Sequence, residues 1–274
     1  MDSVLPGPAL TAIGVAMIRS TESCRPDALY RDPWAQRFVD DARAFVSPTD
    51  WTQVSTLADR MYESRTIGVR LVDDVLLDAV AAGCVQVVLL GAGLDTHAFR
   101  LSWPRAVTVF EVDLPALFDF KERVMSGEDV QPQCQRRIVA TDLRSIWAPQ
   151  LRDAGFDANL PTCWIDHVGV SLPRNDALRI ASRVTELSAT GSRYSVPAVT
   201  TDAMKELIGT VAGAERLYRG DTLRQQQSGL GAPGIADLQR TGWTVEFHDV
   251  ADIATRYGRP HAGGAGSVNV IAVR

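Results

Sequence analysis

The sequence predicts an α/β fold in which helices wrap a mostly parallel sheet. Short apolar runs alternate with amphipathic stretches through the middle of the chain. One of these runs, residues 85–90, leads directly into the glycine turn Gly91-Ala92-Gly93. With 274 residues, of which 46% are hydrophobic, the chain can build one good core. We therefore expect a single domain over residues 1–274.

Six apolar segments have the length and composition of strands. Four lie in the middle of the chain and are rich in Val, Ile or Leu, as buried parallel strands are. They cover residues 85–90, 107–112, 137–140 and 163–172. Two late segments, 243–250 and 268–273, are separated by the glycine-rich loop HAGGAG. We expect these two to pair antiparallel at one edge of the sheet.

Amphipathic stretches between the strands predict helices. They cover residues 114–125, 146–154, 174–187 and 201–211. The polar, glycine-containing segment 216–234 predicts an exposed lid. The first 80 residues also show helical periodicity, so the chain divides into a helical extension at 1–80, a core at 81–200, and a lid segment with the last strands at 201–274.

Composition argues against several classes of function. The net charge is -5 and no block of like charge occurs, which disfavours nucleic-acid binding. The longest apolar stretch, 84–94, is far shorter than the roughly 20 residues of a membrane helix. The start of the chain lacks the pattern of a signal peptide, so we expect no membrane association and a cytoplasmic location. The four cysteines and four histidines are scattered, so no metal site is predicted.

The glycine turn is the first candidate binding feature. Glycines at Gly91 and Gly93 let the backbone turn sharply and let a ligand approach without interference from Cβ atoms. A dinucleotide fingerprint has a third glycine where this chain has Thr96, which weakens a nicotinamide interpretation. Alone, the turn is weak evidence for a nucleotide.

Acidic residues at the ends of the next two strands strengthen the evidence for a nucleotide site. Glu111 and Asp113 follow the glycines by about 18 to 20 residues, where an acid that binds ribose is expected. The alternative is an acidic pair that stabilises a helix N-terminus. Asp142 follows the third strand, and Leu143 beside it offers an apolar wall for a purine. An aspartate in this position, taken alone, is more often a helix N-cap than a ligand.

The motifs GAGLDT, FEVDLP and ATDLR, with the upstream pair Arg65-Thr66, resemble class I S-adenosylmethionine-dependent methyltransferases of the leucine carboxyl methyltransferase type. The resemblance is closest to bacterial, largely actinobacterial, relatives. It extends to residues 11–39 and to the late GWTVEF and YGRP, so it spans nearly the whole chain. It implies a Rossmann-like fold: a mostly parallel seven-stranded sheet with an antiparallel edge strand, an N-terminal helical extension and a lid.

The resemblance also implies S-adenosylmethionine as cofactor and assigns residues to it. Arg65 is implied to hold the methionine carboxylate, and Gly91 and Gly93 to pack on the amino-acid end. Asp113, with Glu111 nearby, is implied to bind ribose. Guanidinium and carboxylate groups suit these partners chemically.

The remaining assignments fall on the third and fourth strands. Asp142 and Leu143 are implied to bracket adenine. The fourth strand reads IDHVGVSLP where relatives read something like AEGLLMYLP. Asp166 therefore stands in place of Glu, whose position is implied to bind the cofactor. Asp keeps the charge but is one methylene shorter, so its contact to the cofactor's amino group is either lost or relayed by water. His167 replaces Gly, and Ser171 replaces Tyr.

Two histidines depart from the family pattern. His167 is interpreted either as a general base beside the transferred methyl group or as a half-buried imidazole bound by a backbone carbonyl. His97 stands where relatives mostly have Arg and is interpreted as a surface or packing residue.

The leading hypothesis is an O-methyltransferase that acts on a small-molecule acceptor. A carboxylate acceptor needs no base, whereas a hydroxyl acceptor does. The second hypothesis is a cofactor-binding protein that no longer transfers methyl groups, because the fourth-strand motif is altered. A nicotinamide oxidoreductase is the third. The sequence leaves the acceptor and the oligomeric state open.

Overall fold

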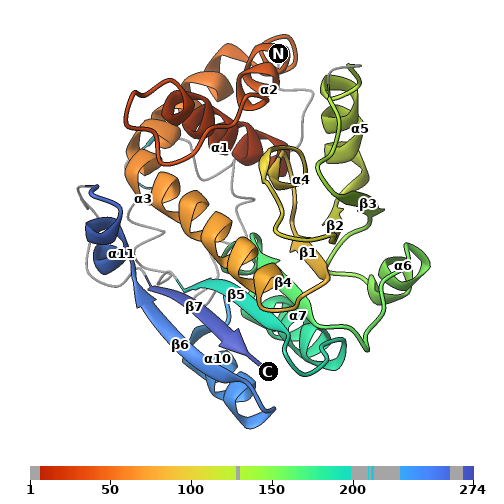
Figure 1. Ribbon diagram of the computed structural model, residues 1–274. Helices are drawn as coiled ribbons and strands as arrows, with labels where there is room; N and C mark the ends of the chain where they lie inside the picture. Colours follow the sequence, from red (N-terminus) through yellow and green to blue (C-terminus); the bar gives the residue numbers. More distant parts are fainter. Residues whose placement is uncertain (1–6, 128–129, 199–208, 210, 213–228, 260–267) are drawn as a thin grey trace.

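A seven-stranded sheet flanked by helices on both faces forms the protein (Figure 1). The computed structural model describes residues 7–127, 130–198, 209, 211–212, 229–259 and 268–274. The strand order is β3-β2-β1-β4-β5-β7-β6, which confirms the predicted Rossmann-like fold. The strands are β1 (Gln86–Leu90), β2 (Thr108–Asp113), β3 (Gln135–Ala140), β4 (Thr162–Asp166), β5 (Arg193–Ala198), β6 (Thr244–Asp249) and β7 (Val268–Val273).

Strands β1 to β5 pair in parallel, and β7 runs antiparallel between β5 and the edge strand β6. The predicted late antiparallel pair is therefore confirmed. The fourth predicted strand was too long: β4 ends at Asp166, and a short 3₁₀ helix, η1 (Gly169–Ser171), follows. Strand β5 was not predicted from its residues, because the segment RYSVPA contains no apolar run.

Nine α-helices lie in the described part of the chain. They are α1 (Gly7–Ser23), α2 (Ala35–Ala42), α3 (Pro48–Ala81), α4 (His97–Arg100), α5 (Pro115–Val124), α6 (Ala148–Asp153), α7 (Arg174–Glu186), α10 (Gly231–Arg240) and α11 (Val250–Arg256). The predicted N-terminal helical extension is thus α1 to α3. The predicted helix at 201–211 and most of the predicted lid at 216–234 lie outside the described residues. Residues 231–234 of that lid begin α10, and α11 occupies part of the segment expected to be a loop.

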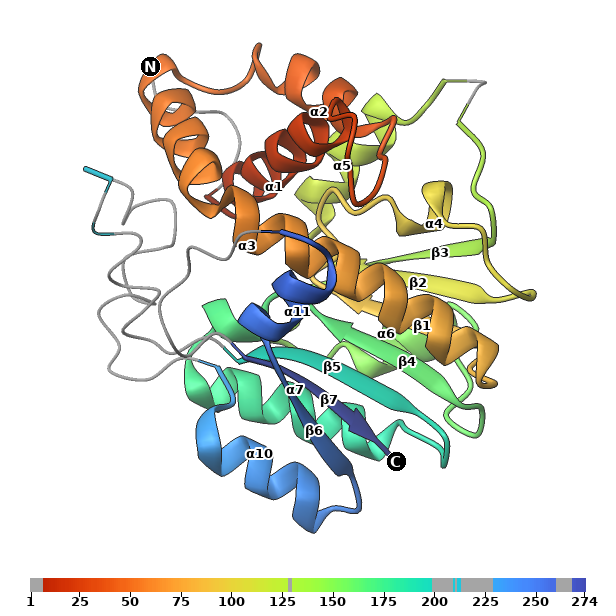
Figure 2. The same cartoon turned by 60° about the vertical axis from the view of Figure 1, so that its left-hand side comes forward.

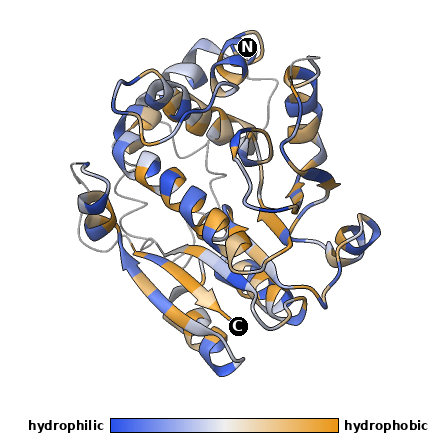
Figure 3. Cartoon of the chain, in the orientation of Figure 1, coloured by the Kyte–Doolittle hydropathy of each residue, from blue (hydrophilic) through white to orange (hydrophobic). Residues whose placement is uncertain are grey.

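The sheet separates two apolar cores. Val87 and Leu89 of β1 pack with side chains from α1, α2, α3, α5 and α11. Val88 and Leu90 point to the other face and pack with α6, α7 and α10. Figure 2 shows α3 crossing one face while α7 and α10 cover the other, and Figure 3 shows the apolar strands between them. No described helix is long and apolar enough to cross a membrane.

Candidate functional site

The carboxyl ends of β1, β2 and β4 meet at the point where the strand order reverses. Ligands of open α/β sheets bind in the crevice beyond such a switch point. Leu90 lies opposite both Val112 and Asp166, and Asp113 lies opposite Ala140. The register therefore places the predicted site residues that follow these strands along one edge of the sheet.

The turn after β1 depends on glycine. Gly91 has φ +76° and Gly93 has φ +49°, both in the left-handed region. A Cβ atom on Gly91 would lie 2.0 Å from Cγ1 of Val168, in the turn after β4. The two turns on either side of the switch point are therefore in direct contact.

Asp113 holds the glycine turn in place. Its Oδ2 accepts a hydrogen bond from the backbone N–H of Gly93 at 2.6 Å, and its Oδ1 accepts one from Leu114 at 2.7 Å. Burial raises the pKa of Asp113, and the two backbone hydrogen bonds oppose this rise. Each carboxylate oxygen has a second lone pair, so Asp113 retains capacity to accept hydrogen bonds from ligand hydroxyls.

Glu111 belongs to a buried ion cluster, which corrects the expectation that it assists Asp113. The residue is fully buried, and its Oε2 lies 2.7 Å from both Lys121 Nζ on α5 and Arg136 on β3. Buried carboxylates need such partners, because an unpaired charge in the core is costly. The structure therefore gives Glu111 a role in packing α5 against the sheet.

Asp142 and Leu143 follow β3 at the same edge. The Asp142 side chain is 34% exposed and pairs with the guanidinium of Arg144 at 2.5 Å. Its Oδ1 also accepts a hydrogen bond from the Arg144 backbone at 2.9 Å. Leu143 packs into the second core. The carboxylate therefore remains accessible to a ligand, beside an apolar side chain.

Asp166 closes the turn after β4 with its own carboxylate. Its Oδ1 accepts hydrogen bonds from the backbone of Val168 at 3.0 Å and Gly169 at 2.6 Å. Its Oδ2 accepts one from the hydroxyl of Tyr194 at 3.0 Å. Burial raises its pKa. The carboxylate has three protein donors and is 1% exposed, so it is closed off from solvent.

His167 follows β4 directly and faces the site. Its backbone N–H donates to the carbonyl of Leu90 at 2.9 Å. Nε2 is buried without a hydrogen-bond partner in the described residues, although 30% of the side chain is exposed. Burial lowers the pKa of His167 to about 4, against the opposing effect of Asp95. The imidazole is therefore neutral near neutral pH.

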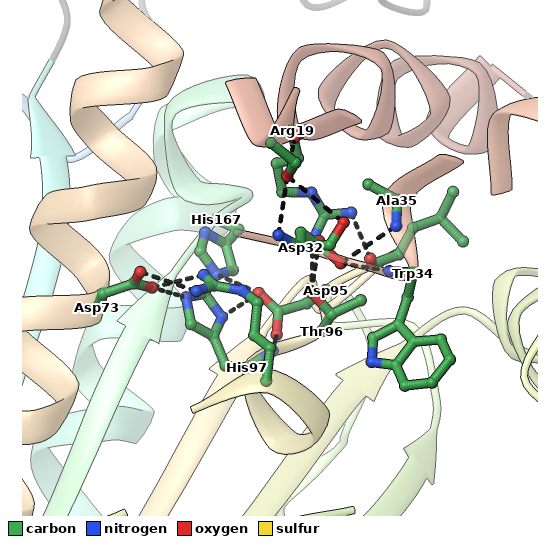
Figure 4. Close-up of polar contacts among 12 residues, drawn as sticks. Arg19, Asp32, Trp34, Ala35, Asp73, Asp95, Thr96, His97 and His167 are labelled. Atoms are coloured by element: carbon green, nitrogen blue, oxygen red, sulfur yellow. Dashed lines mark hydrogen bonds and ion pairs between the residues drawn. The ribbon is translucent and has the colours of Figure 1, made fainter. Parts of the chain in front are cut away.

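His97 is 3% exposed, so it is a packing residue and not a surface one. Its Nδ1 contacts Asp95 Oδ2, and its Nε2 lies 2.9 Å from Asp73 Oδ1 (Figure 4). Arg100 pairs with the same Asp73 at 2.5 and 2.8 Å. Burial opposes a charge on His97, but the carboxylates outweigh it and raise the pKa of His97. Sequence spacing gave no sign of this cluster.

Helix α1 is attached to the glycine loop through Arg19. The guanidinium donates to the carbonyl of Leu94 at 2.6 Å and lies 3.2 Å from Asp32 Oδ2. The same oxygen of Asp32 accepts a hydrogen bond from the Thr96 hydroxyl at 2.7 Å (Figure 4). These buried contacts place the N-terminal helices beside the carboxyl end of β1.

Arg65 on α3 contributes positive charge to the same site. It is half-buried, and its charge is among those that lower the pKa of His167. Among the residues that the structure describes, no carboxylate pairs with it. A guanidinium in this position suits an anionic ligand such as a carboxylate.

Comparison with known proteins identifies the family. The sequence model of the leucine carboxyl methyltransferase family matches residues 12–183. The chain belongs to this family. A protein of Streptomyces coelicolor named for S-adenosylmethionine-dependent methyl transfer is 35% identical over 274 residues, covering 96% of this chain and 94% of that protein. A similarly named Parafrankia protein is 37% identical over 258 residues, covering 93% of this chain and 82% of that one.

Solved structures agree with this leucine carboxyl methyltransferase fold. A Streptomyces avermitilis protein of the duf574 family aligns with a TM-score of 0.51 and 17% identity, covering 94% of this chain and 96% of that one. The plantazolicin methyltransferase BamL, solved with S-adenosylhomocysteine, aligns with a TM-score of 0.54 and 10% identity, covering 94% and 97%. At these identities the likeness shows the fold alone.

The leucine carboxyl methyltransferase-like protein is thus an S-adenosylmethionine-dependent methyltransferase. The residues of the site fit that cofactor. Glycines with positive φ open the turn after β1, Asp113 keeps acceptor capacity, and Arg65 offers a cation. Glu111 and Asp166 do not fit, because their carboxylates are committed to protein partners.

Proposed function

We propose that this protein transfers the methyl group of S-adenosylmethionine to an oxygen atom of a small metabolite. The observation that carries the proposal is the neutral, half-buried imidazole of His167, located where β4 ends beside the glycine turn. A neutral imidazole can accept the proton of a hydroxyl group. A carboxylate acceptor would use the same site without that step.

Six residues would hold the cofactor at the carboxyl ends of β1, β2 and β3. They are Arg65, Gly91, Gly93, Asp113, Asp142 and Leu143. Arg65 would bind the methionine carboxylate, and Asp113 the ribose hydroxyls. Asp142 and Leu143 would contact adenine. When bound, the cofactor supplies an electrophilic methyl group for in-line displacement.

The protein's own contribution is mainly to position the acceptor and exclude water. Methyl transfer needs the acceptor atom about 3 Å from the methyl carbon, and correct placement lowers the barrier substantially. Helix α1, fixed to the glycine loop by Arg19, would form one wall of the acceptor site. The half-exposed ring of His167 would form another.

The test uses S-adenosylmethionine labelled on the methyl group, with a panel of hydroxyl and carboxylate acceptors. We expect labelled product to appear in an organic extract. Treatment with alkali then separates the acceptor classes, because methyl esters release methanol and methyl ethers remain intact. Amine acceptors are included in the same panel, and transfer of the label to amines alone would overturn O-methylation.

A second candidate is a protein that binds the cofactor without transferring methyl groups. The position of Asp166 favours this second candidate, because its carboxylate is buried and accepts hydrogen bonds from its own turn. Under this candidate, S-adenosylhomocysteine binds but no label reaches any acceptor in the panel. Turnover with any acceptor would exclude it.

A further inference from the structure

The carboxylate of Asp95 lies between two histidines. Its Oδ2 contacts Nδ1 of His97 and lies 3.9 Å from Nε2 of His167. Its Oδ1 accepts a hydrogen bond from the His97 backbone at 2.8 Å. Figure 4 shows both imidazole rings turned toward this carboxylate. Asp95 thus connects the turn after β1 with the turn after β4.

A second carboxylate supports this arrangement from helix α3. Asp73 lies 2.9 Å from Nε2 of His97 and pairs with Arg100. Asp73, Asp95 and His97 are at most 8% exposed. Two carboxylates and two cations balance one another, which a buried ionic cluster requires. The ring of His97 contacts Asp95 through Nδ1 and lies within ion-pair distance of Asp73 through Nε2, so the two carboxylates lie on opposite sides of one buried cation.

Nε2 is the ring nitrogen of His167 on the side of Asp95. Nε2 is buried and faces the carboxylate, whereas Nδ1 is not among the buried unpaired atoms. At 3.9 Å the contact is longer than a direct hydrogen bond, so the carboxylate acts on Nε2 through its charge. A carboxylate on the Nε2 side stabilises a proton there and leaves the Nδ1 lone pair free.

We propose that Asp95 is a positioning residue that keeps His167 in the Nε2–H tautomer, so that Nδ1 accepts the proton of a hydroxyl acceptor. Asp73 and His97 are positioning residues for Asp95. The inference rests on the proposed function and narrows the substrate class to hydroxyl compounds. The acceptor oxygen bonds to the methyl carbon, the sulfur–methyl bond breaks with its electron pair left on sulfur, and the hydroxyl proton passes to Nδ1 and then to water.

The charged groups that act on His167 come from four parts of the fold. Asp95 acts on the ring from the turn after β1, and three cationic groups act on it from α1, α3 and α4, namely Arg19, Arg65 and His97.

The first test is the nitrogen NMR spectrum of the full-length protein labelled with ¹⁵N-histidine. The chain has only four histidines, so single substitutions assign every ring. In the wild-type protein at neutral pH, we expect His97 protonated on both nitrogens and His167 neutral with the proton on Nε2. A neutral His167 with its proton on Nδ1 would overturn the inference.

Variants test the positioning chain, by which we mean Asp73, His97 and Asp95 acting in series on His167. In Asp95→Asn, we expect the Nε2–H preference of His167 to be lost and its pKa to fall, because Asp95 opposes the lowering. Asp73→Asn should produce a smaller change in the same direction. His97→Gln should weaken the Nε2–H preference of His167 but not lower its pKa, because the substitution also removes a cation that lowers this pKa. Asp119→Asn, an exposed carboxylate on α5, is the matched control and should leave the ring signals unchanged. An unchanged His167 signal in folded Asp95→Asn would contradict the proposal, and the wild-type spectrum decides it if the variants do not fold.

Failure of this inference and failure of the proposed function give different results. If the wild-type protein does not bind S-adenosylhomocysteine, the proposed function is wrong, whatever the tautomer. If it binds and His167 carries its proton on Nδ1, only the positioning chain is wrong. If the labelled product is an alkali-labile ester, O-methylation stands and the hydroxyl class is wrong.

Discussion

Gly91 lies against Val168, so closely that a Cβ atom on Gly91 would be 2.0 Å from Cγ1 of Val168. The contact joins the turn after β1 to the turn after β4. It explains how His167, which no spacing rule connects to the glycine motif, comes to face the same site. The geometry of the two turns is therefore interdependent.

Replacing Gly91 with Ala should destabilise the protein by about 2 to 5 kcal/mol in urea unfolding. Left-handed backbone costs an L residue roughly 1–2 kcal/mol, and overpacking adds about 1–3 kcal/mol. Gly258 has a similar φ of +66°, and among the described residues no atom lies within 4 Å of where its Cβ would be. Gly258→Ala should therefore show the backbone cost alone. Adding Val168→Ala to Gly91→Ala should recover part of the loss. Equal losses of unfolding free energy in Gly91→Ala and Gly258→Ala would show that crowding against Val168 adds no cost.

Stability should depend on pH through His97. The pKa of His97 is raised from 6.5 in the folded state. The contribution of its protonated ring to the free energy of unfolding is therefore complete below pH 6.5, and it is lost as pH rises through the pKa of the folded state. The pKa values of Asp73 and Asp95 are lowered from 3.8 in the folded state. The contribution of these two carboxylates to the free energy of unfolding is therefore lost as pH falls below 3.8. Urea midpoints measured from pH 5 to pH 9 should fall at the alkaline end. The fall should be smaller in His97→Gln, and an equal fall in both proteins would exclude His97 as its source.

Removing Arg19 should loosen the glycine loop. Arg19→Ala leaves the buried carboxylate of Asp32 without its cation, a change that typically costs about 3–5 kcal/mol. Amide hydrogen exchange at residues 91–97 should accelerate, because Leu94 and Thr96 lose contacts to α1. Arg60→Ala, at an exposed position of α3, is the control. Unchanged exchange at the loop would show that α1 does not hold it.

Glu111 should matter for stability and not for cofactor affinity. Glu111→Gln removes the charge that pairs with Lys121 and Arg136, with an expected loss of about 3–5 kcal/mol. The affinity of the folded variant for S-adenosylhomocysteine should remain within about threefold of wild type, which is below 1 kcal/mol. A tenfold loss of affinity in the folded variant would restore Glu111 as a ligand.

The sequence predicted most of the sheet and the position of the site. Strands β1 and β2 were recognised from apolar runs, and the site from the glycines and Asp113 that end them. Strand β5 was missed because its position between β4 and β7 comes from pairing and not from an apolar run.

The errors at the site have a common physical cause. Glu111 and Asp166 stand where ligand carboxylates are expected, but the partners that occupy them, Lys121 and Tyr194, lie elsewhere in the chain. The contact between Asp73 and His97 likewise joins α3 to α4 across 24 residues. Contacts of this kind are decided by tertiary packing, which short motifs do not encode.

The most direct test of the account is calorimetric titration of the wild-type protein and Asp113→Ala with S-adenosylhomocysteine. Asp113 is central because it shapes the glycine turn and is proposed to bind ribose. We predict micromolar affinity for the wild-type protein and at least a tenfold loss in the folded variant, which corresponds to about 1.4 kcal/mol. Equal affinity in both proteins, or no binding by the folded wild-type protein, would contradict the location of the cofactor site at the ends of β1 and β2.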